Sequence, residues 1–559
     1  MDYGVEDIYH YLNTTENDTY PSTMLKNMEC GAAMLARHIA NNDKILLVVD
    51  DDCDGFTSSA LLMNYLHMLF PYFVENNIQY YIHEGKKHGI LNADIIMPDI
   101  ALVIAPDSSS NEYALHERLA QQGIDILILD HHKAPYYSQH ACVINNQMGD
   151  YPDKDLSGAG VVYKFCSYFD KKYGYNFADE FLDLAAVGII GDMMDLSNLE
   201  TRYIIYNGLS NLKNYGLRRF ALKQAFSIGS STELTPTDVS FYIAPLVNAL
   251  IRVGTMSEKE TLFKAFISGP NDTEQSTKRG AKPGDLEVIS DKAARIATNA
   301  RNRQNKMIDQ SVQFLQGKIE KECLDENKVL VIALDDEESQ YVNPNLTGLV
   351  AMKICQMYGR PAVVARIADD DVYKGSFRVN SNSPIENFKE FCSESGLVEY
   401  AEGHEQAAGI GIAAKNLNKF IRYCNKKLAN TNMGEGTFFV DFEFNGNDCG
   451  EIGKICIELD PLSKIYGKGI EEPKLIVKDI IFDENDVFIM GKDKSSAKIT
   501  KNGISFVKFK DSDFVDAIQN YKLGLLTIYG KMNLNEYMGT VTPQIIIEDY
   551  ELKNAKAMF

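Results

Sequence analysis

Short apolar runs and amphipathic segments alternate along the first third of the chain. The strand-like runs and helix-like segments are, in order, 45–50, 57–69, 78–82, 100–105, 112–121, 126–130, 158–173 and 181–190. Strands that alternate with helices in this way are typical of a parallel sheet with helices on its faces. The sequence therefore predicts an α/β fold for this part of the chain.

The first strand-like run ends in a crowd of carboxylates. Asp50, Asp52 and Asp54 lie within five residues, and Thr57 begins a Thr-Ser-Ser sequence that can cap the following helix. Like charges a few ångströms apart cannot all stay ionised unaided, so this turn favours protons or a hard divalent cation. A solvated acidic turn is the alternative. An EF-hand does not fit, because its twelfth position is Leu61 rather than Glu and a strand enters the loop.

Acidic and imidazole groups follow three further apolar runs. Asp107 follows the run that begins at residue 100, and Asp192 ends the apolar segment 185–190. Asp130 ends the run that begins at residue 126, and His131 and His132 come directly after it. Because the carboxyl ends of parallel strands meet at one sheet edge, where ligands bind, we expect all four endings to lie in register there. A pair of surface imidazoles is the alternative interpretation of the two histidines.

In the second half of the chain the pattern of predicted helices and strands changes twice. We predict a linker at 268–284, a solvated connecting helix at 285–322, and a second α/β unit that opens with a strand at 329–333 and a helix at 346–358. Short β-rich runs follow at 438–444, 474–482, 487–490, 504–509, 525–529 and 544–547. Such runs predict a small barrel or sandwich. The expected domains are 1–270, 271–322, 323–433 and 434–559.

Composition limits the class of protein. The 559 residues carry a formal charge of -22, which argues against indiscriminate adhesion to nucleic acid or anionic membrane. The ten cysteines form no CxxC pair, and the N-terminus lacks a basic region followed by an apolar one. We therefore expect a reduced, cytoplasmic protein that is a monomer and does not enter a membrane.

The acidic and histidine motifs together resemble a known family. In order and spacing, Asp50-x-Asp52-x-Asp54, Asp107, Asp130-His131-His132, 157–160 and 188–192 resemble the motifs of the DHH phosphoesterase superfamily. Segments 245–252, 346–351, 359–364, 375–378 and 402–409 resemble its RecJ branch. Ile251, Val379 and Glu402 depart from that branch's pattern. The resemblance covers most of the chain. It implies a parallel-sheet DHH domain, a long helix, a smaller α/β DHHA1 domain and a C-terminal OB-like barrel.

The resemblance also implies roles for individual residues. Ligands of two Mn²⁺ or Mg²⁺ ions would come from Asp50, Asp52, Asp54, Asp107, His131 and Asp192, with Asp50 either a ligand or a support for one. Asp130 would orient a neighbouring histidine, and His132 would contact the scissile phosphate. Contacts to phosphate or nucleic acid would come from Ser157, Asn248, Arg252, Arg378, Gly403 and His404.

The function implied is that of a RecJ-like, single-strand-specific 5′-to-3′ DNA exonuclease. Single-stranded DNA is the expected partner, with a single-strand-binding protein or a helicase as further candidates. A phosphodiesterase for short oligoribonucleotides or cyclic dinucleotides is one alternative, and a non-catalytic replication scaffold is another. The C-terminal module mixes the lysines and aromatics used to bind single strands, namely Lys492, Lys494, Lys498, Lys501, Lys508, Lys510, Phe488, Phe506, Phe509 and Tyr529. We expect it to act as a tether for long strands.

Overall fold

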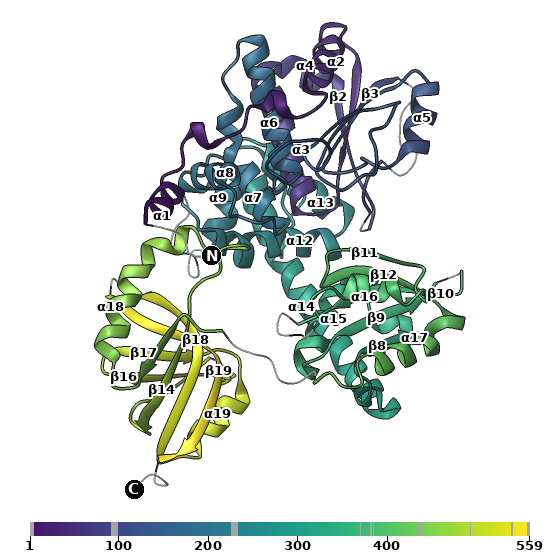
Figure 1. Ribbon diagram of the computed structural model, residues 1–559. Helices are drawn as coiled ribbons and strands as arrows, with labels where there is room; N and C mark the ends of the chain where they lie inside the picture. Colours follow the sequence, from purple (N-terminus) through teal and green to yellow (C-terminus); the bar gives the residue numbers. More distant parts are fainter. Residues whose placement is uncertain are drawn as a thin grey trace.

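The computed structural model describes residues 5–85, 87–90, 99–224, 228, 233–368, 370–380, 383, 385–432, 439–491, 493–537 and 540–555. Figure 1 shows a first sheet at the top, a second at the lower right and a third at the lower left, with helices between them. The predicted boundary at 433/434, the start of the predicted strand 438–444 and Lys492 lie outside the described residues. None of the described helices is both long and apolar enough to cross a bilayer.

The first sheet has five parallel strands in the order β2-β1-β3-β4-β5. They are β1 (Lys44–Val49), β2 (Ile78–Ile82), β3 (Ile100–Pro106), β4 (Asp125–Asp130) and β5 (Cys142–Asn145). The predicted parallel α/β sheet is thus confirmed, and β5 is an additional strand. Both faces of the sheet are covered, which explains why its strands are continuous apolar runs rather than alternating ones.

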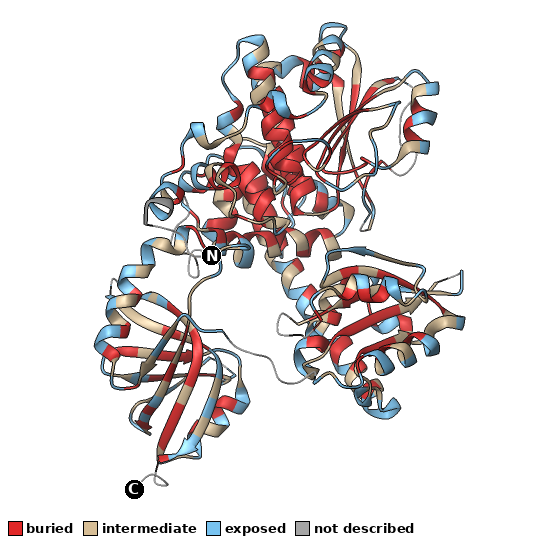
Figure 2. Ribbon diagram, in the orientation of Figure 1, coloured by how far each residue is buried: buried red, intermediate tan, exposed pale blue. Residues whose placement is uncertain are grey.

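Helices cover the two faces of this sheet unequally. One face packs on α2 (Met28–Ala40), α3 (Cys53–Leu69), α6 (Gly158–Tyr173) and α7 (Leu182–Gly191), and the other on α5 (Tyr113–Gln121). The most deeply buried helices in Figure 2 belong to the first group. The other helices of this part of the chain are α1 (Val5–Leu12), α4 (Pro71–Asn77), α8 (Leu199–Ser210), α9 (Tyr215–Lys223), α11 (Pro236–Asp238), α12 (Ala244–Val253) and α13 (Met256–Ile267).

The predicted linker and connecting helix differ from expectation. Part of the linker pairs as a hairpin of β6 (Thr273–Gln275) and β7 (Leu286–Val288), and α14 (Ile289–Glu322) follows it. This helix is not simply solvated. Ala293 and Ala297 on its first half are buried in the first core, and Leu315 and Ile319 on its second half are buried beneath the second sheet. The helix therefore fixes the two α/β units to each other.

The second sheet has the order β11-β12-β10-β9-β8. Its strands are β8 (Leu330–Leu334), β9 (Ala362–Ile367), β10 (Val372–Arg378), β11 (Tyr400–Gly403) and β12 (Ala407–Ala413). Only β8 and β9 are parallel. The helices are α15 (Thr347–Tyr358) on one face and α16 (Phe388–Glu394) and α17 (Ala414–Lys427) on the other. Helix α15 ends at Gly359 with φ 63°, a left-handed stop that favours glycine.

The C-terminal part is built on a seven-stranded sheet in the order β13-β14-β18-β19-β17-β16-β15. The strands are β13 (Phe442–Asn445), β14 (Lys474–Asp483), β15 (Val487–Met490), β16 (Ser496–Lys501), β17 (Ile504–Lys508), β18 (Leu523–Tyr537) and β19 (Thr540–Asn554). Helices α18 (Cys449–Leu459) and α19 (Ser512–Gln519) pack on its core and were not predicted. The β-rich texture after about residue 436 is thus that of one large sheet with two helices.

Candidate metal centre

The turn after β1 holds the acidic motif in a fixed conformation. Asp52 is the N-cap of α3 and its Oδ1 accepts the Gly55 N–H at 3.0 Å, so the helix begins at Cys53 and not at the predicted Thr57 cap. A Cβ on Gly55 would come within 2.5 Å of Asp50, so this close turn requires glycine. Asp54 consequently lies in the first helical turn and is buried.

The amino end of α6 cradles the Asp54 carboxylate. Its Oδ1 accepts from the Ser157 hydroxyl at 2.8 Å and from Ala159 N–H at 3.1 Å, and its Oδ2 accepts from Gly158 N–H at 2.7 Å. A helix N-terminus favours a negative charge. Ser157 is fully buried, so the structure places it behind Asp54, where it orients the carboxylate, rather than on a surface open to nucleic acid.

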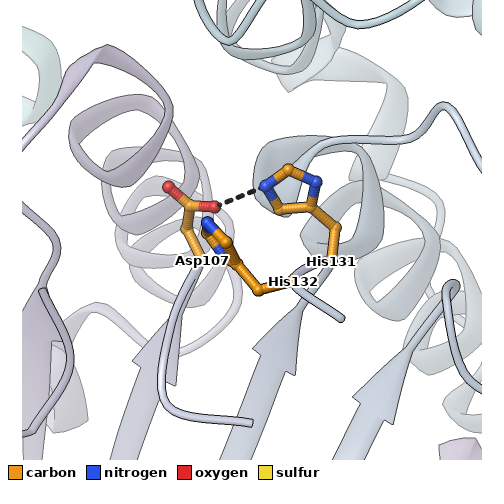
Figure 3. A group of neighbouring side chains, drawn as sticks. All are labelled: Asp107, His131 and His132. Carbon is orange, nitrogen blue, oxygen red and sulfur yellow. Dashed lines mark ion pairs between the residues drawn. The ribbon is translucent and has the colours of Figure 1, made fainter. Parts of the chain in front are cut away.

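Asp107 and His131 face each other after β3 and β4. His131 Nε2 lies 3.2 Å from Asp107 Oδ1 and 3.4 Å from Asp192 Oδ2, and Figure 3 shows Asp107 directed at the His131 ring with His132 beside them. Asp107 adopts φ 63°, a conformation that Asp tolerates better than most residues. Asp107 Oδ1 and His131 Nε2 are both buried without a hydrogen-bond partner, so two polar atoms are aimed at one point.

Asp192 reaches this point from a different element than predicted. It is the C-cap of helix α7, not the end of a strand in the sheet. The packing of α7 against α3 is close, since a Cβ on Gly188 would sit 2.3 Å from Asp54 Oδ1. Asp54, His131 and Asp192 therefore offer ligand atoms within 4.8 Å of one another, as do Asp107, His131 and His132.

The electrostatics of this cluster favour neutralisation of its carboxylates, by protons or by a cation. Burial raises the pKa of Asp107 and of Asp192 well above the usual range, and the Asp54 and Asp52 carboxylates raise both further. Burial and Asp52 raise the pKa of Asp54 to about 6. Burial, with help from His132, lowers the pKa of His131 to about 4, so its ring is neutral, the form that binds metals. Carboxylate oxygens with one neutral imidazole fit Mn²⁺ or Mg²⁺.

Asp130 holds His132 in one orientation. Its Oδ1 accepts from the backbone N–H of His131 at 2.7 Å and from that of His132 at 3.1 Å, and it contacts His132 Nδ1 at 2.8 Å. Burial opposes protonation of His132, but this hydrogen bond raises its pKa to about 10. Burial alone would raise the pKa of Asp130, yet its contacts with His132 lower it. His132 is half-exposed and protonated, so it is placed to approach an anionic substrate.

His88 is a candidate ligand that sequence reasoning missed. Its Nδ1 lies 2.5 Å from Asp50 Oδ2, and Asp50 Oδ1 accepts the Gly89 N–H at 2.9 Å. His88, Asp50 and Asp52 also offer ligand atoms within 4.8 Å of one another. The available signal was a His-Gly pair shortly after β2, because β2 is parallel to β1 and its carboxyl end shares the acidic edge.

A buried ion pair supports the loop that carries His88. Lys259 Nζ donates to both oxygens of Asp51, at 2.7 and 2.9 Å, and to the backbone carbonyls of His83 and Gly85 at 3.1 and 2.8 Å. Both side chains of the pair are fully or almost fully buried. Asp51, the carboxylate of the acidic turn that does not face the cluster, therefore fixes the loop that carries His88.

Apart from Ser157, the residues predicted to contact phosphate lie in three different places. Asn248 Oδ1 accepts the Cys53 N–H at 3.1 Å, so this residue also supports the first turn of α3. Arg252 and Arg378 line one cavity of about 380 Å³, together with Arg366 and Lys374. Gly403 and His404 lie at the exposed turn between β11 and β12 and are not among the residues lining that cavity.

The cavity is strongly basic. Of the described residues that line it, four are cationic and none is acidic. A Cβ on Gly348 would lie 2.4 Å from Arg378 Nη2, so glycine makes room for the guanidinium. Arg252 lines the cavity, and Asn248, one helical turn earlier on α12, contacts Cys53 in the acidic turn. Burial lowers the pKa of Arg252, while the Asp52 carboxylate raises it. The site therefore pairs a carboxylate cluster with an adjoining anion pocket.

Comparison with known proteins agrees with this geometry. A family model described as "DHH family, N-terminal domain" matches residues 44–189. The SPbeta prophage-derived protein YorK of Bacillus subtilis, named as a single-strand DNA-specific exonuclease, is 34% identical over 99% of this chain and 95% of its own. The single-stranded-DNA-specific exonuclease RecJ of Bacillus subtilis is 26% identical over 96% of this chain and 65% of its own. The crystal structure of Thermus thermophilus RecJ with Mn²⁺ superposes with a TM-score of 0.71 at 19% identity, covering 95% of this chain and 72% of that one.

Proposed function

The chain belongs to the family of RecJ-like single-strand-DNA-specific exonucleases, and we propose that it removes nucleotides from the 5′ end of a DNA single strand by metal-assisted hydrolysis. The observation that supports this most directly is the buried cluster of Asp54, Asp107, His131 and Asp192, with two unpartnered atoms aimed at one point beside a basic cavity.

We assign the metal ligands in two sets. Asp54, Asp107, His131 and Asp192 would hold one cation, and Asp50 and Asp52 would hold a second, with Asp107 shared. Manganese is the cation we favour, with magnesium as the alternative. When bound, such a pair supplies a nucleophilic water at neutral pH and neutralises the phosphate oxygens.

The remaining side chains position the substrate. His132 is protonated and half-exposed, so it donates a hydrogen bond to the scissile phosphate or a proton to the leaving oxygen. Asp130 keeps the His132 ring in that orientation. Arg252 and Arg378 hold a phosphate of the DNA in the basic cavity. The turn of the second sheet that carries Gly403 and His404 covers the bound DNA.

The basic cavity gives a reason for binding the strand by a terminal phosphate. A phosphate with a free end carries more charge than an internal diester, so a pocket with four cations binds a terminal phosphate in preference. Arg252, whose pKa burial lowers and the Asp52 carboxylate raises, would then hold that end on the side of the metal ligands. In this proposal the third sheet acts as an OB-like single-strand binder, with Phe488 and Lys498, which are in cation–π contact, on its surface.

The function is tested with purified protein, manganese and oligonucleotides labelled at either end. We expect immediate release of a 5′ label as a mononucleotide, stepwise shortening of a 3′-labelled strand, and no attack on a blunt duplex. Release of the 3′ label first would overturn the polarity. Hydrolysis confined to dinucleotides would favour the small-phosphodiesterase alternative, and no hydrolysis at all would favour the scaffold.

Arg378→Gln should abolish the preference for a 5′-phosphorylated end. Because a hydrogen bond to a charged group contributes about 1.5–3 kcal/mol, the KM for the phosphorylated strand should rise roughly ten- to a hundredfold. The KM for a 5′-hydroxyl strand should change little. Arg422→Gln, on the exposed surface of α17, is the matched control. An equal rise in KM for both substrates would contradict the proposal that the cavity binds the terminal phosphate.

His88→Ala should weaken manganese binding. His88 either binds the cation itself or orients Asp50 through their hydrogen bond. Residues in such positions typically contribute about 10–100-fold to metal affinity. Free Mn²⁺ measured by EPR during a titration gives the affinity directly. His67→Ala, on the exposed end of α3, is the control. Unchanged affinity in the His88 variant would exclude this residue from the centre.

A further inference from the structure

A tight turn of the C-terminal part of the chain lies beside the catalytic cluster. The Gly467 N–H donates to Ile470 O at 2.9 Å, and the Ile470 N–H donates to Gly467 O at 3.1 Å. Gly469 has φ 85°, the conformation that the third position of a type II turn requires. Lys468 and Gly469 therefore form the tip of the turn.

The tip is seated on the segment that follows Asp192. The Leu196 N–H donates to Lys468 O at 2.8 Å. A Cβ on Gly467 would lie 2.3 Å from Leu196 Cδ1, and a Cβ on Gly469 would lie 2.0 Å from Asp195 Oδ1. Both glycines are therefore needed for this close approach.

The base of the turn is anchored as well. Tyr11, Ile465 and Tyr466 form a separate buried cluster between the N-terminal helix and the turn. Arg202 Nη1 donates to Lys464 O at 2.7 Å. A module that only tethered DNA would not need contacts of this kind, so the turn is held in a fixed position against the first α/β unit.

The Lys468 side chain is exposed and shares its surroundings with the catalytic groups. Among the residues that the structure describes, it makes no ion pair and no side-chain hydrogen bond. The backbone carbonyl of Lys468 accepts from the Leu196 N–H, four residues after Asp192, and burial together with the Lys468 ammonium group lowers the pKa of His404. Burial raises the pKa of Asp155, and the Lys468 charge opposes this rise. The alternative is therefore that Lys468 only stabilises the fold through Asp155.

We propose that the turn 467–470 forms a wall of the catalytic cleft and that Lys468 at its tip binds a phosphate of the single strand next to the metal centre. The inference rests on the proposed function. It means that the C-terminal part of the chain supplies a substrate-positioning residue, in addition to any binding by its sheet. Lys468, His404 and His132, from three separate parts of the chain, then surround the same stretch of backbone.

The test compares Lys468→Gln and Lys468→Arg with a matched control, Lys454→Gln, which removes an exposed charge from α18 of the same C-terminal part. The substrate is a 5′-phosphorylated pentanucleotide. Steady-state hydrolysis with manganese gives kcat and KM, and fluorescence anisotropy in EDTA gives binding without hydrolysis.

For Lys468→Gln we expect a KM about tenfold higher with little change in kcat, because one charged hydrogen bond to the strand is lost. The slope of log affinity against log salt should become shallower by about 0.7, the value for one phosphate contact on a single strand. Lys468→Arg should restore most of the binding. A structural role through Asp155 would not change the salt slope.

Three results would overturn the inference. They are binding and KM of Lys468→Gln equal to wild type, the same loss in Lys454→Gln, and a Lys468→Arg protein as weak as Lys468→Gln. Failure of the proposed function is seen separately, as wild-type protein that releases no nucleotide with manganese. The anisotropy measurement still decides on Lys468 in that case.

Discussion

Asp107→Asn should abolish hydrolysis and leave the fold intact. Asp107 is buried, lies 3.2 Å from His131 Nε2, and is the ligand that we propose the two cations would share. Loss of a single preorganised electrostatic contact costs about 10²–10³ in kcat, and loss of a shared ligand should cost more than about 10³. Asn keeps the side-chain shape and tolerates the φ of 63°. Initial rates on a 5′-phosphorylated strand with saturating manganese provide the measurement.

The Asp107→Asn variant should lose activity but keep or gain thermal stability in the metal-free state. Burial and the neighbouring carboxylates hold the pKa of Asp107 well above its usual range, so the metal-free protein gains by losing this group. The variant should therefore unfold at the same or a higher temperature in EDTA. Asp371→Asn, at an exposed turn with a φ of 58°, is the control for the same substitution at a positive φ. Full manganese-dependent activity in the Asp107 variant would refute the metal assignment.

Manganese should stabilise the protein by an amount that grows with pH. A ligand that binds only the native state adds roughly 2.7 kcal/mol at a hundredfold excess over its Kd. The pKa of Asp54 is about 6 in the folded protein because of burial and Asp52, against about 3.9 unfolded. A raised folded-state pKa contributes stability below pH ~4 that is lost as pH rises through about 6. The metal-free protein therefore weakens over this window, and bound cations reverse the loss.

The measurement is the difference in thermal midpoint between manganese-loaded and EDTA-treated protein from pH 5 to 7.5. Titration of groups outside the centre cancels in this difference. The shift should be small at pH 5 and largest at pH 7.5, and Asp107→Asn should show little shift at any pH. A shift that is independent of pH, or no shift, would contradict a carboxylate-based metal centre.

The placement of Lys468 changes what a truncation can show. If the C-terminal part only tethered long strands, removing the chain after residue 436 would leave cleavage of very short strands nearly unchanged. Since 467–470 packs against Leu196 and Asp195, truncation also removes the contacts of this turn with the segment that follows Asp192. Point variants at the tip separate positioning from tethering, whereas deletion does not.

Local pattern was enough to identify the parallel α/β unit and most of the acidic groups at its edge. Apolar runs of strand length determined β1, β3 and β4, and the residues that follow each run had to emerge at the carboxyl edge. Asp54, Asp107 and His131 were identified for that reason. Short elements without a strong pattern, such as β5 and the helices α18 and α19, were missed.

Only the tertiary structure decided how side chains from separate elements converge on the site. Asp192 arrives from a helix end, His88 reaches Asp50 because β2 pairs with β1, and Ser157 turns behind Asp54. Lys468 comes from a turn far along the chain whose approach depends on two glycines. The spacing of apolar residues along one helix or strand indicates which face of that segment is buried, because residues at regular spacing share a face. The convergence of separate segments depends instead on packing between them, and no local pattern in the sequence encodes it.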